Sequence, residues 1–268
     1  MESTRAALRN WLGQCLEPEP LTWLDDTCAA IASGAPARRF DLAFSSAARR
    51  VGKTPLGLDD EAANQARGLR TGWQPAGWTT EQAARTLLVL HLPAEDPEEF
   101  RARLDRSFES ADIGELVALY QALPLLPHQE IHVARCREGL RSNITPVFCA
   151  VAHRNPYPAE QLAEDAWNQM VLKALFVGAE LAPIEGLDNR ANPALSRMLC
   201  DYAHERWSAG RPISPELWRC VGPHADDAAV ADLARALETG DEATRAAVVA
   251  TLKTCPHPRA EELLATHD

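Results

Sequence analysis

Apolar residues recur along this chain at the three- and four-residue spacing that is typical of amphipathic helices. Near the start, for example, Leu8, Trp11 and Cys15 fall on one face of a predicted helix that covers residues 4–16. Strict alternation of apolar and polar residues, the pattern of half-buried strands, is essentially absent. The periodicity therefore predicts an all-α fold.

Prolines, glycines and capping residues divide this pattern into separate helices. Thr79 with Gln82 matches a capping box, Asp112 and Asn192 are suitable N-caps, and Gly34 ends the second helix. A helix is also predicted after Pro258. The other predicted helices cover residues 4–16, 20–33, 37–51, 59–67, 79–91, 97–110, 112–123, 128–142, 146–152, 164–177, 192–209, 214–221, 226–237 and 241–254.

Short connections between most of these helices favour antiparallel helical hairpins stacked as an irregular α-solenoid, or HEAT-like helical domain. We expect a single all-α domain over residues 1–268. Within it, residues 1–144 form N-terminal hairpins, residues 145–222 carry long polar loops, and residues 223–268 form HEAT-like helices. No regular repeat length is visible.

Charge excludes some classes of partner. The chain has 27 basic and 38 acidic residues, a net charge of −11, which argues against nucleic acid and anionic lipid. One cluster of basic residues is a local exception to this acidic composition. It is either a solvated helix face or a docking patch for an acidic partner or a phosphate. Its members are Arg38, Arg39, Arg49, Arg50 and Lys53.

The cysteines and the hydropathy profile favour a cytoplasmic protein. The seven cysteines include no C-x-x-C pair and mostly occupy apolar helix positions, so we expect reduced core residues. No apolar N-terminal segment resembles a secretion signal, and no apolar stretch approaches 18 residues. We expect no membrane insertion.

Two histidine-containing patterns resemble metal motifs only in part. His128 and His132 have the i, i+4 spacing of a zinc helix, but Glu130 is not at the general-base position, so two surface histidines are favoured. Asp201 and His204 have the i, i+3 spacing of di-iron bundles without a second such motif. No nucleotide-binding or hydrolase motif occurs, so we predict no metal, no cofactor and no assigned catalytic residue.

Polar side chains concentrate between residues 153 and 219, in loops between long helices. Either these groups satisfy one another and hold the loops in place, or they converge on a concave site for a polar metabolite. On the second interpretation, the candidate ligand-binding residues are His153, Arg154, Asn155, Tyr157, Trp167, Asn168, Lys173, Asp188, Arg190, Asn192, Asp201, His204, Glu205, Arg206 and Arg219.

The same region resembles the EboA-type metabolite traffic proteins over residues 145–225, with weaker likeness towards the N-terminus. The resemblance rests on A-H-R-N-P-Y-P-A-E from Ala152, D-A-W-N-Q-M-V-L-K-A-L-F-V-G from Asp165, and D-Y-A-H-E-R-W from Asp201. The shorter motifs G-L-D, R-A-N-P and S-P-E-L-W-R continue it.

The resemblance implies a cytosolic role in bacterial secondary metabolism. Such proteins are encoded beside a prenyltransferase-like membrane protein, a TatD-like hydrolase and sugar-phosphate-cyclase-like and sugar-isomerase-like enzymes. That set is linked to making or moving a small metabolite, including export of a pigment precursor in cyanobacteria. The resemblance supplies no catalytic residues.

Three functions remain open from the sequence. The favoured one is a non-catalytic scaffold or carrier that binds a small polar metabolite or a partner enzyme of the pathway. The second is an enzyme of that pathway that uses His153 or His204 as acid or base, beside Asp188, Asp201 or Glu205. The third is a purely structural adaptor that uses the C-terminal hairpins.

Overall fold

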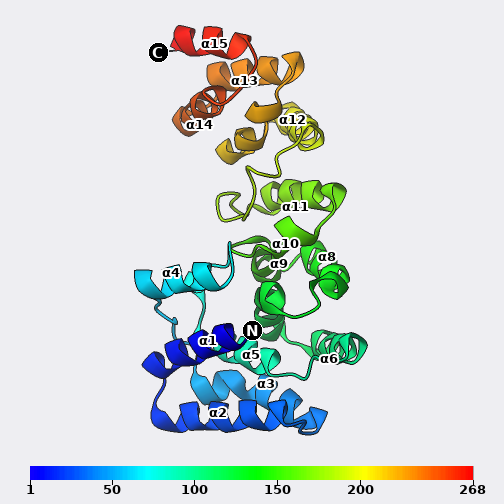
Figure 1. Ribbon diagram of the computed structural model, residues 1–268. Coiled ribbons are helices and arrows are strands. Elements are labelled where there is room, and N and C mark those ends of the chain that lie inside the picture. The colour runs from blue at the N-terminus through cyan, green and yellow to red at the C-terminus, as the bar shows by residue number, and fades with distance from the viewer. Residues whose placement is uncertain (268) are drawn as a thin grey trace. The chain divides into compact units, whose positions relative to one another are not determined.

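The computed structural model describes residues 1–267, and helices dominate throughout (Figure 1). No strand occurs among these residues, and only an isolated bridge joins Pro55 to Thr79. The all-α prediction is confirmed, whereas the HEAT-like stacking stays a prediction. The chain divides into two compact units, Met1–Gln161 and Leu162–Asp268.

Ten α-helices and three short 3₁₀ helices form the described first unit. Most lie within two residues of their predicted positions. They are α1 (Glu2–Cys15), α2 (Pro18–Ala32), α3 (Ala37–Val51), α4 (Asp60–Leu69), η1 (Pro75–Gly77), α5 (Thr80–Leu90), α6 (Pro97–Ser110), α7 (Ile113–Ala122), η2 (Leu123–Leu125), η3 (Gln129–His132), α8 (Val133–Arg141), α9 (Thr145–Ala152) and α10 (Tyr157–Gln161).

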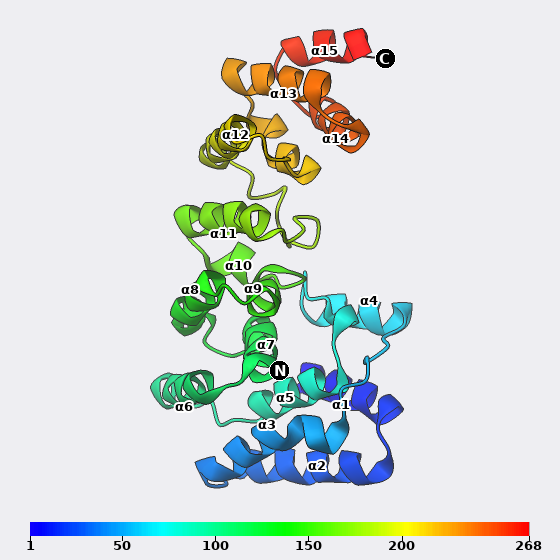
Figure 2. The ribbon, with the colours of Figure 1, turned by 180° about the vertical axis from the view of Figure 1, so that it is seen from behind.

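Helix α5 is the centre of the first unit. The predicted capping box is present at its start, where the backbone N–H of Thr79 donates to Gln82 Oε1 at 2.8 Å. Helix α5 packs against α1, α3 and α7, and every one of its residues except Gln82 is buried. Helices α2 and α3 lie side by side, in blue in Figures 1 and 2, and close the unit beyond α5.

A buried ion network centred on α5 was not predicted from the sequence. Arg85 is 2% exposed, donates to Glu81 Oε2 at 2.8 Å and to the Phe44 carbonyl at 3.1 Å, and lies 4.0 Å from Glu115. Lys53 of the basic cluster lies 3.7 Å from the other oxygen of Glu81. Each buried charge therefore has a partner, as burial requires.

The region around His128 and His132 corrects one prediction. A single helix over residues 128–142 was expected, but η3 precedes α8, and His128 has a left-handed backbone with φ of 54°. His132 is 2% exposed, so it is not a surface residue. The Nε2 atoms bond to different backbone carbonyls, Ala94 for His128 and Pro127 for His132, and are therefore engaged with the backbone.

The second unit consists of α11 (Glu164–Val177), α12 (Pro193–Ser208), η4 (Pro215–Cys220), η5 (Gly222–His224), α13 (Asp227–Thr239), α14 (Glu242–Leu252) and α15 (Arg259–His267). Asn192 caps α12 as predicted, because its Oδ1 accepts from the Leu195 backbone at 2.8 Å. The predicted helix at residues 214–221 is the 3₁₀ helix η4.

Helix α14 packs on both η4 and α13, and these elements lie within the yellow-to-red part of the ribbon, together with α12 and α15 (Figure 2). Trp218 of η4 is fully buried at this junction. Helix η5 approaches α14 most closely at Gly222, because a Cβ at this position would lie 2.4 Å from Thr251 Cγ2. The absence of a side chain at Gly222 therefore lets η5 pack against α14.

The cysteine prediction is correct for most positions. All seven thiols are free; Cys28, Cys136, Cys200 and Cys220 are buried, but Cys15 is exposed. Burial raises the pKa of the Cys28 thiol to about 12, which leaves it protonated and unreactive at neutral pH. None of the described helices has the length and apolar character needed to cross a bilayer.

Candidate functional site

A pocket of about 620 Å³ opens in the second unit between the loop before α12, the two 3₁₀ helices and α14. Its volume is within the range of small-molecule sites. Two of the sequence-predicted binding residues, Asp188 and Arg219, line it. The full lining comprises Asp188, Pro215, Glu216, Arg219, Pro223, Ala247, Ala250, Thr251 and Thr254.

Asp188 and Arg219 form a two-pronged ion pair beside this pocket. Arg219 Nε donates to Asp188 Oδ1 at 2.6 Å, and Nη2 donates to Oδ2 at 2.6 Å. The hydrogen bonds to Asp188 raise the pKa of Arg219, which is charged in any case. Both side chains are about half exposed, so a competing ligand group can reach them at a cost of about 1 kcal/mol or less.

Glu216 holds the loop that carries Asp188. Its two carboxylate oxygens accept backbone N–H groups of Leu181 at 2.9 Å and Ala182 at 2.8 Å. Glu216 belongs to the S-P-E-L-W-R motif but was not among the residues predicted to bind a ligand. Because the bond crosses 35 residues of chain, no local pattern indicates it.

The part of the lining that comes from α14 is mostly apolar. Ala247, Ala250 and Thr251 recur at helical spacing along one face of α14, and Pro215 and Pro223 add further apolar surface to the lining. Short side chains on this face leave room for a ligand body. The pocket therefore combines an apolar cavity with a charged pair at its polar edge, which suits an amphipathic small molecule.

The candidates near the end of the first unit serve its own structure. Asn155 is 3% exposed; its Nδ2 donates to the Tyr120 and Ala150 carbonyls, both at 3.1 Å, and its Oδ1 accepts from the Tyr157 backbone. The Tyr157 hydroxyl donates to the Gln129 carbonyl. Tyr157 begins the short helix α10.

The remaining two residues of this segment differ in exposure. Arg154 is exposed and has a left-handed backbone with φ of 52°, and its carbonyl accepts from the Gln74 backbone at 3.3 Å. His153 is half-buried.

The side chains of Asn168 and Asn192 form hydrogen bonds to one another within the second unit. Their side-chain amides exchange two hydrogen bonds, of 2.9 and 3.2 Å, between α11 and the start of α12. The Arg190 guanidinium lies 4.7 Å from the centre of the Trp167 ring, and burial lowers the pKa of Arg190. These four residues hold the long loop before α12.

Helix α12 carries four of the other candidates, Asp201, His204, Glu205 and Arg206. His204 Nε2 lies 2.6 Å from Asp232 Oδ1 of α13, and its ring stacks on Trp207 at 5.9 Å. The partner of His204 is thus none of the carboxylates that the enzyme hypothesis named. Arg206 Nε donates to the Pro212 carbonyl at 2.9 Å.

Three further candidates, Asp201, Glu205 and Lys173, lie outside the pocket lining. Asp201 and Glu205 are exposed, and Lys173 is half-buried on α11, where burial lowers its pKa. Among residues 1–267, no group of three or more His, Cys, Asp or Glu side chains is placed to hold a metal ion.

Comparison with known proteins identifies the family of this chain. The family model described as metabolite traffic protein EboA matches residues 4–222. No curated protein and no solved structure matches the chain. The matched segment contains Asp188, Glu216 and Arg219 but ends before α14. Because the match spans most of the sequence, the chain belongs to the EboA family of metabolite traffic proteins.

Proposed function

We propose that this EboA protein is a non-catalytic carrier that holds a small amphipathic metabolite of its pathway in the pocket beside α14. The observation that carries the proposal is the pairing of an apolar cavity of about 620 Å³ with the exposed ion pair of Asp188 and Arg219. The family description, metabolite traffic, is compatible with such a role.

In this proposal, the apolar lining and the ion pair of the pocket have separate roles. Contact with the alanines, prolines and threonine methyl groups stabilises an apolar ligand body by roughly 25 cal/mol for each Å² buried. The polar end of the ligand meets Arg219 if it is a carboxylate or phosphate, and Asp188 if it is a hydroxyl or amine. Glu216 fixes the loop that carries Asp188 and so keeps Asp188 beside Arg219.

The enzyme hypothesis has one observation in its favour, the contact between His204 and Asp232. Neither residue lines the pocket, and no histidine or cysteine is part of its lining. Its two carboxylates already have partners, Arg219 for Asp188 and the Leu181 and Ala182 backbone for Glu216, which favours binding and loop positioning as their roles. We therefore propose transport or storage in preference to a reaction.

Native mass spectrometry of the protein isolated from its own host tests this proposal. We expect a small-molecule adduct on the wild-type protein and its loss in Ala250→Trp, because an indole at this position fills the cavity. Ala231→Trp is the matched control, since Ala231 is exposed on α13 and lies outside the lining. The control should keep the adduct.

A titration with 1-anilinonaphthalene-8-sulfonate provides a second measurement, because this probe joins an apolar ring system to one anion. Ala250→Trp should weaken its binding about tenfold or more, and Arg219→Gln should weaken it less. Equal binding by wild type and Ala250→Trp, together with an adduct that persists in Ala250→Trp, would exclude the pocket as the carrier site.

A further inference from the structure

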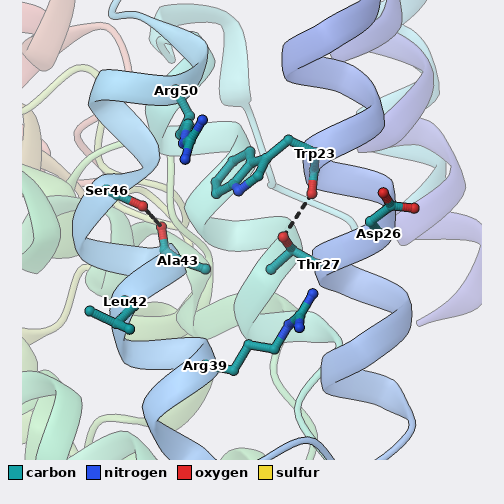
Figure 3. Close-up of a pocket in the computed structure, with 8 residues that line it drawn as sticks. All are labelled: Trp23, Asp26, Thr27, Arg39, Leu42, Ala43, Ser46 and Arg50. Atoms are coloured by element: carbon teal, nitrogen blue, oxygen red, sulfur yellow. Dashed lines mark hydrogen bonds between the residues drawn. The ribbon is translucent and has the colours of Figure 1, made fainter.

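A second pocket, of about 330 Å³, lies in the first unit between α2 and α3 (Figure 3). Its lining includes Trp23 and Thr27 from α2, and Arg39, Ser46 and Arg50 from α3. The α3 residues share one helical face, since they are separated by seven and four positions. The basic cluster seen in the sequence thus borders a cavity.

The two arginines are directed into this pocket. In Figure 3 their guanidinium groups point toward one another from opposite ends of the gap between the helices, with Trp23 and Thr27 between them. The Arg50 guanidinium lies 5.8 Å from the centre of the Trp23 ring. A flat or apolar ligand body can lie against the half-buried indole while its anionic groups meet the arginines.

Neither guanidinium forms an ion pair with a carboxylate in the part of the chain that is described. Asp26 lines the same pocket, but its carboxylate points away from both arginines in Figure 3. Both arginine side chains are exposed, so solvent hydrates them and an anion can reach them, in a protein whose net charge is −11. Charge complementarity favours an anionic occupant.

Helix electrostatics does not explain Arg39. Cations are favourable in the last turn of a helix, and this accounts for Arg50 without any ligand. Arg39 occupies the first turn of α3, which contains no acidic residue, and a cation there opposes the positive end of the helix dipole. A bound anion offsets this unfavourable placement.

We propose that this pocket is a second ligand site, which binds a small molecule carrying phosphate or carboxylate groups on an aromatic or apolar body. Arg39 and Arg50 bind the anionic groups, and Trp23 packs against the body. The site is independent of the pocket beside α14, because it belongs to the other compact unit and shares no residue with that pocket.

The test is an NMR and calorimetric titration with 1-naphthyl phosphate, using inorganic phosphate and 1-naphthol as partial probes. We expect the Trp23 indole N–H resonance, assigned through Trp23→Phe, to shift with 1-naphthyl phosphate. The same shift should appear in Ala250→Trp, where the other pocket is blocked. The two partial probes should bind at least tenfold more weakly, because each lacks one half of the recognised ligand.

Matched arginine variants separate the pocket from a general basic surface. Arg39→Gln and Arg50→Gln should each weaken binding about tenfold or more. Arg38→Gln and Arg49→Gln change the net charge equally but lie outside the lining, so they should change affinity less than about twofold. Circular dichroism checks that all four variants stay folded.

Two outcomes would overturn the proposal. One is an unchanged Trp23 resonance at saturating probe. The other is an equal loss of affinity in all four arginine variants, especially if a hexaglutamate peptide binds with the same pattern, because that result would assign the cluster to an extended surface for an acidic protein partner.

Discussion

At the scale of single residues, polar side chains of one type have different roles in this protein. Asn155 and Asn168 are buried and use their amides to join backbone and side-chain groups within their own units. Arg219 has a half-exposed side chain at the edge of a pocket. The sequence indicates where polar residues gather, but the direction of each side chain depends on packing between distant segments.

Asn168→Ala should lower the free energy of unfolding of the second unit by about 1–3 kcal/mol, because it removes both hydrogen bonds between the buried Asn168 and the half-buried Asn192 amide. Urea denaturation followed by tryptophan fluorescence measures the change. Asn189→Ala is the control, since Asn189 is exposed in the adjoining loop, and it should change stability by less than about 0.5 kcal/mol.

This expectation distinguishes a structural amide from a ligand-binding one. If Asn168→Ala folds as stably as wild type and binds 1-anilinonaphthalene-8-sulfonate more weakly, Asn168 contacts ligand and the structural interpretation is wrong.

At the scale of helices and their contacts, glycines decide how closely neighbours approach. A Cβ on Gly139 of α8 would lie 2.6 Å from the Tyr120 ring of α7 and 2.7 Å from Val151 Cγ2 of α9. A Cβ on Gly68 of α4 would meet nothing within 4 Å. The same substitution therefore has opposite consequences on two helices of one unit.

We expect Gly139→Ala to destabilise the first unit by about 1–3 kcal/mol through overpacking. Gly68→Ala should stabilise it by roughly 0.5–1 kcal/mol, because alanine is the better helix former. Denaturant titrations of the two variants measure both effects. A stable Gly139→Ala protein would mean that α8 can move away from α7 at little cost.

Helix positions were predictable from sequence because their signals are local. The capping box at Thr79, the N-cap at Asp112 and the proline that starts α6 each act within one turn and match the structure. The 3₁₀ geometry of η3 and η4 was not predicted, because short helices of either kind have similar residue spacing.

At the scale of the whole molecule, the sequence predicted the fold class and one region of polar residues, but not the pocket. Asp188 and Arg219 were both named, although nothing in the sequence pairs them across 31 residues. The alanines of α14 resemble any apolar helix face until their neighbours are known. Pockets depend on such long-range contacts, which periodicity does not encode.

Acid should destabilise the molecule partly through His132, which is buried, and His91, which is half-buried. Burial lowers the pKa of His132 below 6.5, and the same holds for His91. As the pH falls below 6.5, these histidines become protonated in the unfolded chain but stay neutral in the folded chain. The stability that their neutral forms contribute is therefore complete above pH 6.5 and is lost as the pH falls from 6.5 toward the lowered pKa.

His132→Gln should reduce this loss between pH 7 and pH 5 by about 1.4 kcal/mol for each unit by which the His132 pKa is lowered. Glutamine keeps an N–H donor for the Pro127 carbonyl that His132 contacts through Nε2. Free energies of unfolding of wild type and variant across this pH range provide the test. Parallel pH profiles would show that His132 titrates normally in the folded protein.

The pocket beside α14 joins two parts of the chain that differ in their relation to the family. Its charged edge belongs to the segment that the EboA model matches, whereas Ala247, Ala250 and Thr251 lie beyond that segment. If the pocket is the carrier site proposed above, the size of the ligand body and the chemistry of its headgroup depend on different parts of the chain. Exchanging residues on α14 alone should then change which ligands bind while the contacts to Asp188 and Arg219 are retained.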